Sequence, residues 1–151
     1  MNLLKFLFTL IIAFYFTSCS TLKLSPAEFG WAIESVLKVD TDGFVKDDRY
    51  SISFNVKAMF FEETKDSLSY MDKSIRLIRN NEGFYFMTSP NFKNVYVFTV
   101  IQNAFELKEK FLITESGLKK PAFNQRLPFI ELIDGEKTYK LTSKGIDGGL
   151  K

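Results

Sequence analysis

The stretch that decides the fold covers residues 83–113 and reads GFYFMTSPNFKNVYVFTVIQNAFELKEKFLI. It contains three runs of aromatic and β-branched residues, separated by Ser89-Pro90-Asn91 and by Gln102-Asn103-Ala104. Such runs favour strands, and such separators favour turns. The stretch therefore predicts three consecutive antiparallel strands. Residues 92–101 are apolar on both faces, which predicts the most central strand of a sheet.

Strand and turn signals continue on both sides of this stretch. Residues 50–60 alternate between apolar and polar side chains, which is typical of a strand buried on one side. Further strands are predicted at residues 74–79, 129–133 and 138–141, and connections at residues 62–73 and 114–128. The chain is therefore predicted to be all-β, an antiparallel β-sandwich or small barrel of about seven to eight strands.

Residues 28–40 allow two interpretations. Ser25-Pro26-Ala27-Glu28 has the form of a helix cap, and the apolar residues after it fall on one helical face. The same apolar residues also occupy mostly odd positions, as in a strand. The strand is favoured because Gly30 weakens the first turn of a helix.

The first 18 residues have the form of a signal peptide. Lys5 precedes an apolar run over residues 6–16. A spanning helix needs about 20 apolar residues, whereas the apolar part of a signal peptide needs about 7–15. We therefore expect a helical signal peptide at residues 1–18, ahead of the β domain.

The motif Phe16-Thr17-Ser18-Cys19 resembles the lipobox of bacterial lipoproteins. The resemblance implies that Cys19 receives diacylglycerol, becomes the first residue after cleavage and is then acylated at its amino group. Cys19 is the only cysteine, so it has no partner for a disulfide within the chain. Residues 19–27 are then the lipidated cysteine and a tether, residues 28–145 a single β domain, and residues 146–151 a loose tail.

The same resemblance implies a location in the bacterial cell envelope, with the membrane bound through the lipid on Cys19. In lipoproteins of bacteria with two membranes, aspartate after the cysteine tends to retain the protein at the inner membrane. Ser20 stands there instead. We therefore expect a lipid-anchored protein of the outer membrane that faces the periplasm.

Charge and composition exclude several classes of function. Residues 1–18 contain one charged residue, Lys5, so 19 Lys and Arg remain against 18 Asp and Glu. A nearly neutral chain has no field that gathers nucleic acid. The chain has no histidine, which excludes histidine triads, histidine metal ligands and histidine general bases. We therefore expect no catalytic residues and no cofactor.

One acidic segment was considered as a metal site. Asp40-Thr41-Asp42-Gly43, followed by Asp47-Asp48, has oxygen ligands of the kind that calcium prefers. It lacks the further acids of a calcium loop, and Asp-Gly is common in turns. A plain turn is the favoured interpretation, and no metal site is predicted.

Two sets of residues are candidates for binding. The connection 114–128 is long, and long ordered loops are often functional. Its candidates for an envelope protein partner are the basic Lys119, Lys120 and Arg126, the amides Asn124 and Gln125, and the anchor Phe123. The aromatic candidates for a ligand groove are Trp31, Tyr50, Tyr85 and Tyr96.

The sequence thus predicts a lipid-anchored envelope protein whose β domain binds or scaffolds without catalysis. The alternative is a lipoprotein that binds a glycan or another small ligand with exposed aromatic side chains. Most of the excess phenylalanine is expected in the core, because phenylalanine has no polar group that suits partial exposure.

Overall fold

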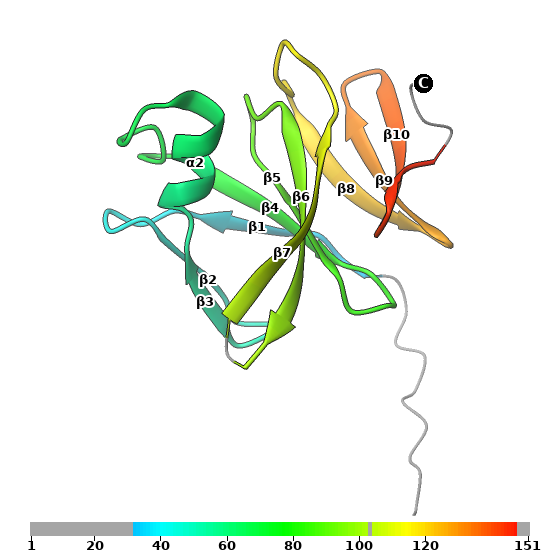
Figure 1. Ribbon diagram of the computed structural model, residues 1–151, viewed down its shortest axis with the longest axis horizontal. Coiled ribbons are helices and arrows are strands. Elements are labelled where there is room, and N and C mark those ends of the chain that lie inside the picture. The colour runs from blue at the N-terminus through cyan, green and yellow to red at the C-terminus, as the bar shows by residue number, and fades with distance from the viewer. Residues whose placement is uncertain (1–31, 103, 148–151) are drawn as a thin grey trace, which may run out of the picture. The chain divides into compact units, whose positions relative to one another are not determined.

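The computed structural model describes residues 32–102 and 104–147 (Figure 1). These residues form eleven antiparallel strands in three sheets and one short helix, and the sheets do not close into a barrel. The predicted all-β antiparallel fold is confirmed. The predicted signal peptide, Cys19 and the tether lie outside the described residues.

A five-stranded sheet of order β1-β4-β5-β6-β7 forms the centre of the domain. Its strands are β1 (Ser35–Lys38), β4 (Ser74–Arg79), β5 (Tyr85–Thr88), β6 (Asn94–Ile101) and β7 (Ala104–Leu112). β4 to β7 follow one another along the chain and pair in that order, as their alternating sequences predict.

Two smaller sheets and a helix complete the fold. The four-stranded sheet has the order β11-β10-β9-β8, and the third sheet is the hairpin β2-β3. Their bounds are β2 (Phe44–Asp47), β3 (Ile52–Asn55), β8 (Pro121–Arg126), β9 (Phe129–Asp134), β10 (Lys137–Thr142) and β11 (Gly145–Ile146). The helix α2 (Lys57–Thr64) follows β3 directly.

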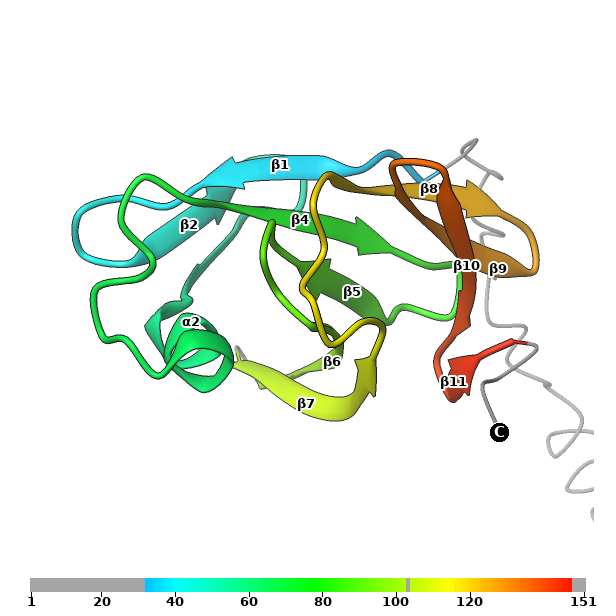
Figure 2. The same ribbon diagram turned by 90° about the horizontal axis from the view of Figure 1, so that it is seen from above.

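The middle of the central sheet, at β5, is buried on both faces, and successive side chains there point to opposite sides. On β5, Tyr85 and Met87 join a core with β2-β3 and α2, which we call the hairpin core, whereas Phe86 joins a core with β8-β9-β10, which we call the second core. Figure 2 shows the four-stranded sheet and the hairpin with α2 at opposite ends of the view. The domain is thus layered, with β5 in the middle.

The predicted central strand is therefore wrong. β6 lies next to the edge strand β7, and β5 occupies the centre with all four residues buried. The first half of β6 is buried on both faces, but its last residues, Val100 and Ile101, are exposed.

The predicted strand at residues 50–60 is also wrong beyond Asn55. Val56, Met59 and Phe60 have the spacing of one helical face, and all three are buried in the hairpin core. The Asn55 side chain accepts the Lys57 backbone N–H at 3.0 Å, which turns the chain into α2. The predicted polar connection at residues 62–73 therefore begins inside a helix.

Three other predictions are settled by strand pairing. Residues 114–128 are not one loop, because β8 pairs with β9 along its whole length. The predicted tail, residues 146–151, is wrong for residue 146, which belongs to β11 and pairs with β10. Of the two interpretations of residues 28–40, the strand is correct for Ser35–Lys38.

Candidate functional site

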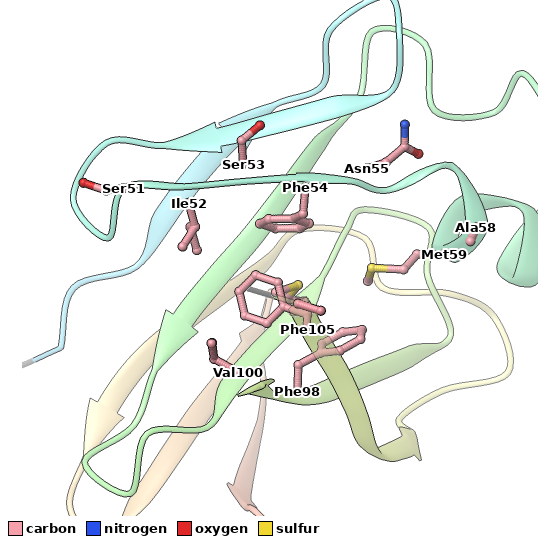
Figure 3. A pocket seen from close by; sticks show the side chains of 12 residues that line it. Ser51, Ile52, Ser53, Phe54, Asn55, Ala58, Met59, Phe98, Val100 and Phe105 are labelled. Atoms are coloured by element: carbon pink, nitrogen blue, oxygen red, sulfur yellow. The ribbon is translucent and has the colours of Figure 1, made fainter. Parts of the chain in front are cut away.

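An apolar pocket of about 630 Å³ opens between β3 of the hairpin, the start of α2, the C-terminal end of β6 and the N-terminal end of β7 (Figure 3). Its apolar lining consists of Ile52, Phe54, Ala58, Met59, Met87, Phe98, Val100, Ala104 and Phe105, and its polar lining of Ser51, Ser53 and Asn55. Binding sites for small molecules commonly have volumes of about 300–1,000 Å³ and mainly apolar walls.

Three phenylalanines form the main wall of the pocket. The Phe105 ring lies 4.9 Å from the Phe54 ring and 6.0 Å from the Phe98 ring, centroid to centroid, in both cases edge to face. On its buried side Phe105 also meets Tyr85 at 5.0 Å. Such edge-to-face contacts fix ring orientation, so this wall is held in place by the core behind it.

A β-bulge places Phe105 in this wall. Val97 pairs with Glu109 and Phe98 pairs with Leu107, so Lys108 is the extra residue on β7. In a regular strand, residues an even number of positions apart point to the same side. Phe105 and Phe111 are six positions apart, yet Phe105 packs on the hairpin core and Phe111 on the second core, because the bulge lies between them. Without this residue, Phe105 would face away from the pocket.

Cross-strand pairing gathers the apolar side chains of the β6-β7 end on one face. Phe98 is opposite Leu107, and Val100 is opposite Phe105. Directly opposite residues in an antiparallel pair point to the same side. This face is the pocket side, and Val100, 49% exposed, lies at the open end of the wall.

The pocket has no charged side chain among its lining residues. In Figure 3, Ile52 and Phe54 point toward Phe98 and Phe105, while Ser53 and Asn55 point to the opposite side of β3. The hydroxyl and amide groups of β3 therefore contribute little to the interior. Such a surface favours an uncharged apolar group.

Glu63 holds α2, and with it one wall of the pocket, against the central sheet. Its carboxylate accepts hydrogen bonds from the Lys93 backbone N–H, the Asn94 amide and the Tyr96 hydroxyl, at 2.7–2.8 Å. Burial, together with the hydrogen bond to Glu63, raises the pKa of Tyr96 above its ordinary value. Tyr96 therefore stays protonated at neutral pH and acts as a structural donor.

The tyrosines predicted for a ligand groove lie behind the pocket. Tyr85 and Tyr96 are 6% and 1% exposed, so their predicted exposure is wrong. Tyr50 is half-buried and meets the Tyr85 ring edge to face at 5.6 Å. Trp31 lies outside the described residues. Phenylalanines rather than these tyrosines line the pocket, and the Tyr96 hydroxyl donates to Glu63 at 2.8 Å.

The six residues predicted for a protein partner do not share one surface. Phe123 and Gln125 are buried, so an exposed anchor at Phe123 is wrong. Gln125 instead accepts the Ala32 backbone N–H at 2.6 Å and donates to Asn81 at 2.7 Å. Their burial follows from β8, whose alternate residues face the second core.

The other four of these residues lie nearer the surface. Lys119 and Lys120 are exposed, and their backbone N–H groups donate to Asp134 at 2.9 and 2.6 Å. Asn124 donates weakly to Glu131, and the exposed Arg126 lies 3.6 Å from the same carboxylate. The basic side chains are therefore divided between the two ends of β8.

The segment Asp40 to Gly43 is a turn, as predicted. One Asp40 carboxylate oxygen accepts the backbone N–H groups of Asp42 and Phe44, at 2.9 and 2.8 Å. Gly43 has a φ of +78°, which glycine adopts readily. Among residues 32–102 and 104–147, no three His, Cys, Asp or Glu residues are grouped so as to hold a metal ion.

Within the described part of the chain, no helix has both the length and the hydropathy needed to cross a membrane. Comparison with protein-family models, with curated proteins and with solved structures finds no match to this chain. The residues and the geometry of the domain therefore carry the functional argument.

Proposed function

We propose that the chain is a lipid-anchored protein of the bacterial cell envelope whose β domain binds a small apolar ligand without catalysing a reaction. The proposal of an apolar ligand rests on the open pocket walled by Phe54, Phe98 and Phe105. A domain that serves only as a scaffold has no need of such a space, because core side chains normally pack to fill the interior.

The chemistry of the wall favours an apolar ligand over a glycan. Sugar hydroxyls that leave water need hydrogen-bonding partners, and an unsatisfied buried polar group costs roughly 1–3 kcal/mol. The pocket wall of β5, β6 and β7 provides only apolar side chains, and the polar side chains of β3 point elsewhere. Phenylalanine and methionine instead gain from contact with hydrocarbon.

The evidence for the proposed lipid anchor is the lipobox-like motif Phe16-Thr17-Ser18-Cys19. Each buried methylene of an acyl chain contributes about 0.8 kcal/mol, and stable attachment needs more than one chain. The diacylglycerol and the amide-linked chain expected on Cys19 satisfy that need. Ser20 supports the periplasmic face of the outer membrane as the site of attachment.

The test of this function uses N-phenyl-1-naphthylamine, an uncharged aromatic probe whose fluorescence rises in apolar sites. Val100 lines the pocket and is 49% exposed, so Val100→Asp places a carboxylate at the mouth without disrupting the core. We expect the variant to bind the probe at least about tenfold more weakly, a loss of about 1.4 kcal/mol.

Ile101→Asp is the matched control. Ile101 is the next residue, is 47% exposed and is not part of the lining, because neighbouring residues of a strand face opposite sides. It should bind the probe as the wild type does. Ala58→Trp, which fills the pocket from α2 without adding charge, should weaken binding as well. Equal affinity of all four proteins would contradict the proposed site.

A further inference from the structure

We infer that the ligand is the acyl chain of a phospholipid from the membrane that carries the anchor. This inference deepens the proposed function and rests on it. Three observations support it: the distribution of polar and apolar groups in the pocket, the gradient of burial along its wall, and the number of residues between Cys19 and the part of the domain that is linked to the pocket rim.

The distribution of polar and apolar groups in the pocket favours an amphiphilic ligand. No lining side chain is charged, so an ionised head group inside the pocket would lose water without gaining a partner. Hydrocarbon meets no such cost. A ligand with a hydrocarbon tail and a polar head therefore places its tail against the wall formed by Phe54, Phe98 and Phe105 and leaves its head in water.

The gradual change in side-chain exposure along the pocket wall favours a long chain over a compact ligand. Met87, at the inner end, is buried, Phe98 and Phe105 are half-buried, and Val100 is half-exposed at the open end. Leu107 lies on the same face, opposite Phe98 on the edge strand β7, and is 47% exposed. The apolar track thus runs from the hairpin core out to solvent, as an extended tail requires.

The flexible walls fit such a chain. Met59 and Met87 line the pocket from α2 and from β5. Methionine has an unbranched and polarizable side chain that adapts to irregular apolar surfaces. The two methionines therefore allow tails of different length or unsaturation to fit the same wall.

The rim of the pocket is linked to Ile33, near the start of the described residues. The Arg49 guanidinium donates a hydrogen bond to the Ile33 backbone oxygen, and Ser51 of the pocket rim is two residues away from Arg49. Ile33 is 14 positions after Cys19 in the sequence, with 13 residues between them. Their fully extended length is about 50 Å at most, which limits how far this rim can lie from the membrane.

The test uses the full chain, lipidated and reconstituted in vesicles of phosphatidylethanolamine and phosphatidylglycerol. The vesicles contain a trace of phosphatidylglycerol with a photoreactive diazirine on its acyl chain. After illumination, we expect label on the tryptic peptide of residues 94–108, which carries Phe98, Val100, Phe105 and Leu107. Val100→Asp should reduce this label at least about tenfold, whereas Ile101→Asp should retain it.

The outcomes separate this inference from the proposed function. Probe binding without phospholipid label on residues 94–108 would overturn the inference and leave the proposed function standing. Label from the same diazirine chain added as a free fatty acid, but not from the phospholipid, would overturn the membrane as the source. If the lipidated wild type does not bind the probe and Cys19→Ala does, the protein's own acyl chains occupy the pocket. This result would also overturn the inference.

Discussion

Replacing Cys19 by alanine is expected to abolish the incorporation of labelled palmitate into the protein. The sulfur of Cys19 is the only thiol in the chain, and it is the atom to which we propose, from the lipobox-like motif, that diacylglycerol is attached. Loss of the thiol removes the site of thioether formation, after which neither cleavage nor amino-terminal acylation follows. The effect is therefore complete rather than partial, and it is measured by label on the immunoprecipitated protein.

The control for this experiment is Ser20→Ala, which changes the neighbouring residue and keeps the thiol. It should incorporate palmitate as the wild type does. Undiminished label in Cys19→Ala would refute lipidation at this residue, and with it the proposed attachment to the membrane. The pocket would then remain a candidate site of a protein without this anchor.

Phe86→Ala is expected to cause the largest loss of folding stability. Phe86 lies on the middle strand of the central sheet and is 0% exposed in the second core. Truncating a buried phenylalanine removes apolar contacts and leaves a cavity, which typically costs about 3–5 kcal/mol. The free energy of unfolding of a domain is about 5–15 kcal/mol, so this variant should lose much of it.

Urea denaturation of the chain expressed without residues 1–18 measures this loss. Phe61→Ala is the matched control, because the same atoms are removed from a side chain that is 50% exposed on α2. It should change the unfolding free energy by about 0.5 kcal/mol or less. Equal losses in the two variants would contradict the assignment of β5 to the centre of the fold.

Much of the central sheet could be predicted from the sequence because its signals are local. Each of β4 to β7 alternates or runs apolar between turn residues, and the turn at residues 80–83 needs a positive φ that Gly83 supplies. Which of these strands lies in the middle depends on what covers each face. That information is tertiary, and for this reason the sequence predicts β6 rather than β5 as the most central strand.

The sequence does not predict α2, because one pattern can satisfy two periods. Val56 and Phe60 are four residues apart, a spacing that fits both a helical face and an alternating strand. Met59 distinguishes the two, since it faces the core only in a helix. β8 was missed because Gln125, a polar residue, takes a buried position that a strand pattern normally gives to an apolar one.

The pocket itself could not be predicted from the sequence. It depends on the bulge at Lys108, which directs Phe105 to the same side as Phe98. No local signal marks this bulge, since Lys108 stands in a charged run that is typical of an exposed edge strand. The excess of phenylalanine was the available signal, but it does not distinguish a core from a groove.

The central claim is that the space between β3, α2 and the β6-β7 end is the ligand site. The protein has four methionines, and NMR of ¹³C-labelled methionine methyl groups reports directly on this space. Met59 and Met87 line the pocket, whereas Met71 lines a separate hollow beside Val39 and Asp40. Titration with N-phenyl-1-naphthylamine should shift the methyl signals of Met59 and Met87 and leave that of Met71 in place. Binding of the probe with a shift of Met71 alone, or with no shift of Met59 and Met87, would contradict the account.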